Sequence, residues 1–371
     1  MKILILKPSS LGDVVQALPV LRLLKRHLPE SQIHWWIESK LAPLLEGDPD
    51  LSGTIRFERQ RWAAPQHWGE LAMSILWVRR QQFDWIIDLQ CLARSGAFAW
   101  LARGKLMVGL DEPREGARGF YDLVARRPSF HTHAVDWYLR VLPLLKVPAH
   151  NSFEWMPRRP EVASKIQQKW PAAADSQWLI LQPGARWINK RWPVEAFAAV
   201  ARQTLDVHPE LRLAVLGGVE DRALGAAIAR AAPERCLDLT GALTLTEMVE
   251  WIRLSRLVVT NDTGPMHVAA ALGKPVVALF GPTEPRRTGP YGQMGNVLQL
   301  ELPCVPCLKS HCRYSKPLEC LRALSPDVVL QAVDRQLRNP DRSRSAGTWE
   351  GRASTKPLIC ANSTLIECKI S

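Results

Sequence analysis

The chain has 371 residues, of which 47% are hydrophobic, and a formal net charge of +12. This length can bury two separate cores, whereas no apolar run approaches the roughly 20 residues of a membrane-spanning helix. The run Ile3 to Leu6 is too short for a signal-peptide core, so we expect a soluble protein that stays in the cytoplasm. The positive charge implies an acidic partner, which could be nucleic acid, anionic lipid headgroups or a phosphorylated small molecule.

The first half of the chain alternates short apolar runs with helical patterns. Lys2–Lys7 is typical of a buried strand and leads through a turn into an apolar-periodic helix, which Pro19 should kink or delay. Further strands are predicted at Gln32–Ile37, Ser52–Phe57 and Asp84–Leu89, and helices at about 40–46, 67–81 and 92–103. This alternation predicts a doubly wound α/β domain.

The turn after the first strand ends in Gly12 and Asp13 and lacks the G-x-G-x-x-G pattern of a dinucleotide site. A carboxylate in the first helical turn at the carboxyl edge of a sheet can cap the helix or act as a base facing a ligand. The residues alone leave both interpretations of Asp13 open.

Arginines gather in the connections of this half. Their guanidinium groups can bind carboxylates or phosphates with two hydrogen bonds, which would suit an anionic acceptor. The alternative is an ordinary solvated basic face. The residues concerned are Arg59, Arg61, Arg114 and Arg118.

A proline-rich stretch between about 145 and 160 predicts the boundary between domains at residues 1–155 and 156–337. Polar, aperiodic residues 338–371 are predicted to form a disordered tail. The second domain repeats the α/β pattern, with strands at Trp178–Gln182, Leu211–Leu216 and Cys236–Leu239, and helices at Val194–Gln203, Leu245–Leu254 and Pro326–Leu337.

The most informative stretch is a strand, helix, strand unit from Val258 to Thr283. Asp262-Thr263-Gly264 lies where the helix begins, and the free N–H groups of a first helical turn favour an anion such as phosphate. The alternative is that Asp262 and Thr263 only cap a structural helix. Two other turns at the same sheet edge carry Lys190 and Glu220. Lys190 and the helix start suit a diphosphate, and Glu220 suits a ribose diol or an amine.

Two segments in this order and separation, KILILKPSSLGDVVQALPVL and NDTGPMHVAAALGKPVVALFGPTEP, resemble glycosyltransferase family 9, the lipopolysaccharide heptosyltransferases. The resemblance covers about residues 1 to 335. It implies a GT-B fold, with two Rossmann-like domains facing across a cleft. It also implies an inverting transfer of L-glycero-D-manno-heptose from ADP-heptose to the Kdo or heptose of the lipid A inner core.

Site residues carried over by this resemblance fall in both domains. The resemblance implies that Asp13 is the general base. The donor contacts are Lys190, Glu220, Asp262, Thr263, Gly264 and His267, although His267 could equally be a packed helix residue. Apart from the resemblance, we expect the acceptor contacts at Ser10, Arg59, Arg61 and Arg114. Lys190 and the helix start can neutralise the leaving diphosphate, so catalysis is expected to need no metal or other cofactor. The expected partners are ADP-heptose, Kdo-lipid A or a heptosylated inner core, and the anionic inner-membrane surface, where the protein would be peripheral; nucleic acid is not expected.

The subclass pattern is mixed. Ser9–Val14, Asp88–Ser95 and Arg114–Gly116 resemble heptosyltransferase I, whereas Pro303–Lys309 and the cysteines that follow resemble heptosyltransferase II and related protein heptosyltransferases.

Four cysteines, Cys304, Cys307, Cys312 and Cys320, fall in one short loop-like segment. Their spacing is compatible with a structural zinc or iron site. The alternatives are free thiols that line a packed loop, or redox-labile pairs.

Three other functions fit parts of the sequence. A nucleotide-sugar epimerase could share the two-domain plan, and the charge would suit a basic nucleic-acid-binding protein, although no reading motif is recognisable. A non-catalytic metal sensor would rest on the cysteines alone.

Overall fold

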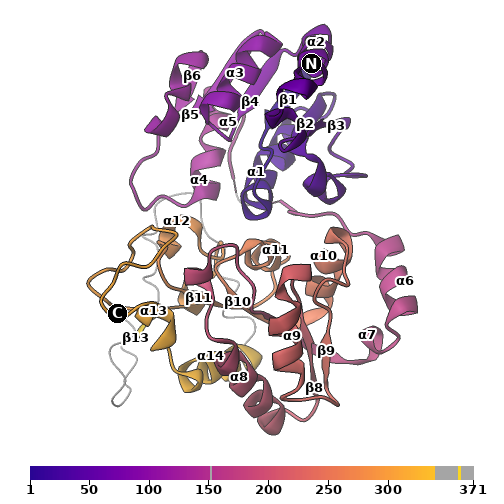
Figure 1. Cartoon of the computed structure of the whole chain (residues 1–371). Helices are drawn as coiled ribbons and strands as arrows, with labels where there is room; N and C mark the ends of the chain where they lie inside the picture. The colour runs from indigo at the N-terminus through magenta and orange to yellow at the C-terminus, as the bar shows by residue number, and fades with distance from the viewer. Residues whose placement is uncertain (151–152, 339–357, 361–371) are drawn as a thin grey trace. The chain divides into compact units, whose positions relative to one another are not determined.

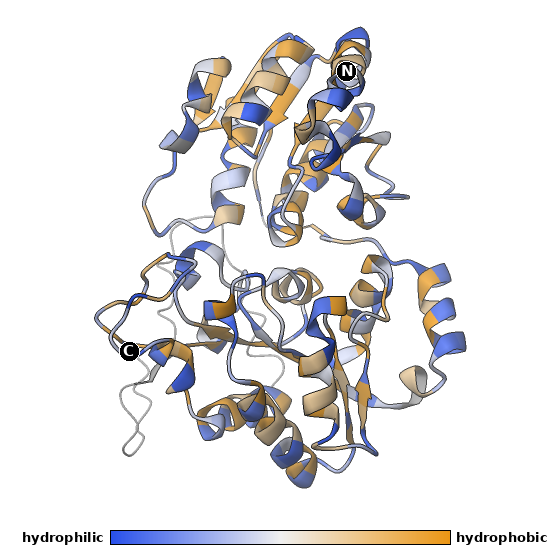
Figure 2. Cartoon of the chain, viewed as in Figure 1, coloured by the Kyte–Doolittle hydropathy of each residue, from blue (hydrophilic) through white to orange (hydrophobic). Residues whose placement is uncertain are grey.

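A computed structural model describes residues 1–150, 153–338 and 358–360. The chain divides into two compact units, of which the first covers Met1–Pro157 and the second begins at Arg158. In the described ranges no helix combines the length and the apolar character that crossing a membrane requires. The strands of both units are mainly hydrophobic and the helices carry residues of both kinds (Figure 2).

The first unit is built on a parallel sheet with the strand order β3-β2-β1-β4-β5-β6 (Figure 1). The strands are β1 (Lys2–Leu6), β2 (Gln32–Glu38), β3 (Gly53–Phe57), β4 (Trp85–Asp88), β5 (Leu106–Leu110) and β6 (Leu123–Ala125). Its helices include α1 (Leu11–His27), α2 (Trp68–Arg80), α3 (Ala93–Ala102), α4 (Ala134–Leu139) and α5 (Val141–Leu144). Leu4, Leu6 and Trp36 form one core cluster with α2 and α3, so both helices cover the same face of the sheet.

Helix α1 corrects one expectation, because it starts directly at Leu11 and continues through Pro19 to His27. Pro19 removes one hydrogen bond of the helix. The residues on both sides of it are fully buried, and we attribute the continuity of the helix to this packing. The prediction that this helix begins late was therefore wrong.

The second unit repeats the plan, with the strand order β13-β12-β11-β10-β7-β8-β9 and parallel pairing throughout (Figure 1). The strands are β7 (Gln177–Gln182), β8 (Leu211–Val215), β9 (Cys236–Asp238), β10 (Ser255–Asn261), β11 (Val276–Phe280), β12 (Val297–Leu300) and β13 (Leu358–Cys360). The helices include α6 (Pro160–Lys169), α7 (Ala172–Asp175), α8 (Val194–Val207), α9 (Arg222–Ala229), α10 (Leu245–Leu254), α11 (Gly264–Ala271), α12 (Pro285–Thr288), α13 (Glu319–Arg322) and α14 (Pro326–Arg338). Two Rossmann-like α/β units, as predicted, are thus confirmed.

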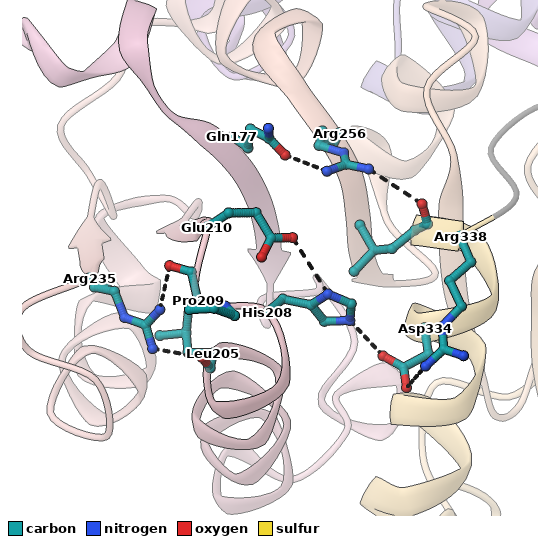
Figure 3. Close-up of polar contacts among 10 residues, drawn as sticks. Gln177, Leu205, His208, Pro209, Glu210, Arg235, Arg256, Asp334 and Arg338 are labelled. Atoms are coloured by element: carbon teal, nitrogen blue, oxygen red, sulfur yellow. Dashed lines mark hydrogen bonds and ion pairs between the residues drawn. The ribbon is translucent and has the colours of Figure 1, made fainter.

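The C-terminal half of helix α14 contacts residues near the amino ends of strands in the second sheet. Nε2 of His208, which follows α8, lies 2.8 Å from Oδ1 of Asp334 (Figure 3). Arg256 of β10 donates to the carbonyl of Leu337 over 3.3 Å. These contacts hold the final described helix against the second unit.

Some elements differ from the predictions. Residues 39–44 form a 3-10 helix instead of an α-helix. Strands β5, β6 and β12 were not predicted: β6 and β12 have only three and four residues, and β5 contains Gly109. A Cβ at Gly109 would lie 2.4 Å from the ring of Tyr121, so glycine is needed there for packing. Most of the predicted disordered tail lies outside the described residues, but Leu358–Cys360 within it pairs with β12.

Candidate functional site

Each sheet has one point where the strand order reverses. In the first unit this switch point lies between β1 and β4, and in the second unit it lies between β7 and β10. Ligands of open α/β sheets bind beyond the carboxyl ends of the strands at such points. The segments that follow these four strands are therefore where the candidate site residues must be sought.

Asp13 lies in the first turn of α1, just beyond β1. Its Oδ2 accepts hydrogen bonds from the Ser10 backbone N–H over 2.9 Å and from the Ser10 hydroxyl over 2.6 Å. The carboxylate therefore caps its own helix, as one of the two interpretations predicted. The side chain remains half-exposed, so it is still accessible to a ligand at the switch point.

Lys7, directly after β1, is a buried charge that the sequence interpretation did not single out. Its Nζ donates to the carbonyl of Leu89 over 2.9 Å and lies 4.8 Å from the centre of the Tyr138 ring. Burial alone would lower the pKa of Lys7, but Tyr138 and Asp13 outweigh burial and raise it. Lys7 thus joins both segments of the switch point and places a positive charge near Asp13. In the sequence, the only sign of this buried charge is that Lys7 directly follows the apolar run of the first strand.

The predicted acceptor residues are more scattered. Arg59 is exposed beyond β3, an edge strand, and Arg61 forms a two-pronged ion pair with Glu70 at 2.5 and 2.8 Å. The Arg114 side chain lies outside the described part of the structure. Ser10, from the same set, is in direct contact with Asp13.

In the second unit the two segments at the switch point are joined by direct contacts. Lys190, which follows β7, donates to Oδ2 of Asp262, which follows β10, over 2.6 Å. Thr283 donates its hydroxyl to the same oxygen over 2.6 Å. The neighbouring Asn261 accepts from the Trp192 N–H over 3.1 Å and donates to the Pro183 carbonyl over 2.7 Å. Lys190 and Asp262, which were each predicted to contact the donor, are therefore bonded to one another.

This cluster changes the role expected for Asp262. Its side chain is only 6% exposed, against 18% for Lys190, and it already has two donors. A buried carboxylate so engaged orients the lysine and reduces its net charge. We therefore treat Asp262 as a residue that positions the Lys190 ammonium.

The start of α11 lies beside this cluster. Thr263 is the N-cap residue with an extended backbone, and its side chain makes no capping hydrogen bond. Thr263 and Gly264 are half-exposed, whereas His267 is buried in the helix. The idea that Thr263 serves only as a side-chain cap is therefore not supported. The N–H groups in the first turn of a helix favour the binding of an anion.

Glu220 is exposed in the turn after β8, and the adjacent Asp221 is buried. Oδ2 of Asp221 accepts from the Gly218 N–H over 3.1 Å, and Arg191 lies 3.6 Å from its Oδ1. Burial raises the pKa of Asp221, although these two neighbours oppose the shift. A Cβ at Gly184 would lie 2.1 Å from this carboxylate, so the two turns pack closely. Asp221 was missed because burial of a single turn residue has no sequence signal.

The four cysteines line one cavity of about 170 Å³ together with Asn189 and Pro282. All four are free thiols. Among the described residues no three or more His, Cys, Asp or Glu side chains are grouped so that they could hold a metal ion. The expectation of a zinc or iron site is therefore not supported, because the thiols share a cavity without converging as ligands. The alternative of free thiols in a packed loop describes what is present.

Comparison with known proteins places this geometry in context. The family model described as glycosyltransferase family 9 (heptosyltransferase) matches residues 76–317. Lipopolysaccharide heptosyltransferase 1 of Pseudomonas aeruginosa is 30% identical over 93% of this chain and 100% of its own length. The solved ADP-heptose lipopolysaccharide heptosyltransferase II of Escherichia coli has a TM-score of 0.74 at 23% identity, covering 92% of this chain and 100% of that one. An Escherichia coli heptosyltransferase solved with ADP-2-deoxy-2-fluoro heptose has a TM-score of 0.70 at 22% identity, over 91% and 100%.

Proposed function

The chain belongs to glycosyltransferase family 9, and from this premise we propose that it transfers L-glycero-D-manno-heptose from ADP-heptose to the Kdo or heptose inner core of lipopolysaccharide. The donor follows from relatives whose names or bound ligands include ADP-heptose or its fluorinated analogue. The observation that carries the proposal is the Lys190–Asp262 pair next to the start of α11, at the switch point of the second sheet. This is a suitable place for the diphosphate of ADP-heptose.

The proposed division of labour assigns the donor to the second unit. The Lys190 ammonium and the N–H groups of Thr263 and Gly264 would bind the diphosphate. Exposed Glu220 would accept hydrogen bonds from the ribose diol, because a carboxylate repels phosphate but accepts from hydroxyl groups. His267 is buried, so its role would be to pack the start of α11.

The first unit would supply the base. Asp13 takes the proton of the acceptor hydroxyl while that oxygen forms a bond to the anomeric carbon, and the bond from this carbon to the diphosphate oxygen breaks on the opposite side. The electron pair leaves with ADP, whose charge Lys190 and α11 stabilise. Attack opposite the leaving group inverts the anomeric configuration. Because a carboxylate is too weak a base to ionise a sugar alcohol beforehand, proton removal must accompany bond formation.

The acceptor would be bound through Ser10 and the exposed Arg59, while Arg61 would first have to leave Glu70. Arg114 stays a candidate for the same role. We further propose that the enzyme works in the cytoplasm at the inner face of the inner membrane, where a lipid-linked acceptor resides. In this account neither a catalytic metal nor nucleic acid takes part.

The relatives include type 1 and type II enzymes, so the test offers both a Kdo acceptor and a heptosylated one. The test is incubation of the purified protein with ADP-heptose and either Kdo-lipid A or heptosylated Kdo-lipid A. We expect one heptose to be added to one of these two acceptors, with ADP released. Donor alone is the control, because an epimerase would convert it without acceptor. If neither acceptor gains heptose, the proposal is wrong.

A further inference from the structure

Helix α2 has two apolar faces, and only one of them is buried. Val78 is fully buried, and Ile75 packs against the same core cluster. On the opposite side, Met73, Leu76 and Trp77 are exposed by 62%, 45% and 48%. Their spacing, with Arg80 one turn later, places all four on one outward face of the helix. Single exposed apolar residues are common, but several large ones on one face of a helix form the kind of surface that is often used for binding.

Helix α3 extends this surface. Its Phe98 and Ala99 belong to the same core cluster as Val78, so α2 and α3 lie side by side on one face of the sheet. Because both helices pack on the same face of the sheet, the sides of α2 and α3 that are turned away from the sheet face the same way. Trp100 of α3 is 57% exposed. We call the set Met73, Leu76, Trp77 and Trp100 the α2/α3 face.

Positive charges border the α2/α3 face. Arg79 and Arg80 end α2, and Arg103 follows the last residue of α3; all three are exposed. Within the described ranges, none of these three side chains forms an ion pair or a hydrogen bond with a protein group. The face therefore combines large apolar side chains with arginines whose charge is uncompensated.

We infer that the α2/α3 face docks on an anionic lipid bilayer, with Trp77 and Trp100 at the level of the headgroups. Tryptophan has an apolar ring with a polar edge and favours the membrane interface, and arginines next to it are attracted to anionic lipids. A second copy of this chain fits less well, because a twofold contact through one face would bring the arginines of both copies together. The inference rests on the proposed function in one respect: an enzyme with a lipid-linked acceptor has to reach that acceptor at a membrane.

The test is co-sedimentation of the full chain with vesicles of phosphatidylglycerol and phosphatidylcholine that contain neither acceptor nor ADP-heptose. We expect binding to the anionic vesicles, little binding to pure phosphatidylcholine, and weakening by salt. The double variant M73S/W77S should reduce the partition coefficient about tenfold or more, because two large apolar side chains no longer enter the interface. The variant R79Q/R80Q should reduce it about 25-fold, at about fivefold for each arginine.

The matched control is Val207→Ser, which removes an exposed apolar side chain, 57% accessible, at the end of α8 in the second unit. It should bind vesicles as the unchanged protein does. The inference is overturned if the unchanged protein ignores anionic vesicles, or if the α2/α3 variants bind as well as the control. It is also overturned if light scattering shows a dimer that M73S/W77S converts to a monomer. Heptose transfer to a soluble, deacylated acceptor should be the same in all variants, so a failure of docking is distinguishable from a failure of the proposed function.

Discussion

Replacing Lys190 with methionine tests whether this residue binds the donor or only neutralises Asp262. The substitution keeps most of the apolar stem and removes the ammonium that lies 2.6 Å from the Asp262 carboxylate. We expect both the affinity for ADP and the stability of the fold to fall. The double variant K190M/D262N separates the two effects, because its asparagine can still accept from Thr283 and has no charge to leave unpaired.

The magnitudes follow from the burial of the pair. Removing one partner of a fully buried ion pair costs about 3–5 kcal/mol. Lys190 retains 18% exposure and Thr283 still donates to Asp262, so we expect a loss of about 1–3 kcal/mol for Lys190→Met. A charge-assisted hydrogen bond to the diphosphate contributes about 1.5–3 kcal/mol, and its loss should weaken ADP binding by about 10-fold to 150-fold.

Urea unfolding measures the stability, and titration calorimetry with ADP measures the affinity. In K190M/D262N the stability should recover by most of the loss, while ADP binding should stay weak. Recovery of ADP binding to the level of the unchanged protein would refute the reasoning. It would mean that the uncompensated Asp262, and not the missing ammonium, had weakened the site.

Two further predictions concern the first unit. Gly109→Ala should destabilise the protein by about 1–3 kcal/mol in urea unfolding, because the new methyl group would overlap the ring of Tyr121. That ring cannot move away easily, since its hydroxyl donates a hydrogen bond to Asp88. The control is Gly119→Ala, which has open space around it, and an equal loss of stability there would contradict the packing argument. Burial raises the pKa of Asp88 above its ordinary value of 3.8, although hydrogen bonds from Cys91 and Tyr121 oppose the shift, so the folded state binds this proton more tightly than the unfolded state. The stability that Asp88 contributes is therefore complete below its unfolded pKa and is lost as the pH rises through the folded pKa. As the pH rises through this range, the free energy of unfolding of Asp88→Asn should increase relative to that of the unchanged protein. A difference in unfolding free energy that does not depend on pH would contradict the raised pKa of Asp88.

The fold could be predicted largely because strands with β-branched apolar residues and helices with clear end signals are local patterns. Helix α10 has the predicted bounds Leu245–Leu254, where Thr244 supplies an N-terminal cap to the Glu247 N–H. Strand β5 was missed because Gly109 weakens the strand pattern. Glycine is needed at this position because the ring of Tyr121, a residue outside the strand, packs against it.

The site was predictable only in part for a similar reason. Asp262-Thr263-Gly264 lies between a strand and a helix that the sequence itself marks, so its location at the sheet edge could be inferred. The contact between Asp262 and Lys190 joins residues 72 positions apart and depends on the strand order β10-β7. The burial of Lys7 likewise depends on Leu89 and Tyr138, which come from other segments.

The central claim is that Asp13 removes the acceptor proton during heptose transfer. The most direct measurement is the turnover of Asp13→Asn with ADP-heptose and Kdo-lipid A both saturating, because asparagine can still accept the two hydrogen bonds from Ser10 and preserve the start of α1. The account predicts that kcat falls about 10²- to 10⁴-fold while the affinity for ADP stays unchanged. Near-normal turnover in this variant would contradict it.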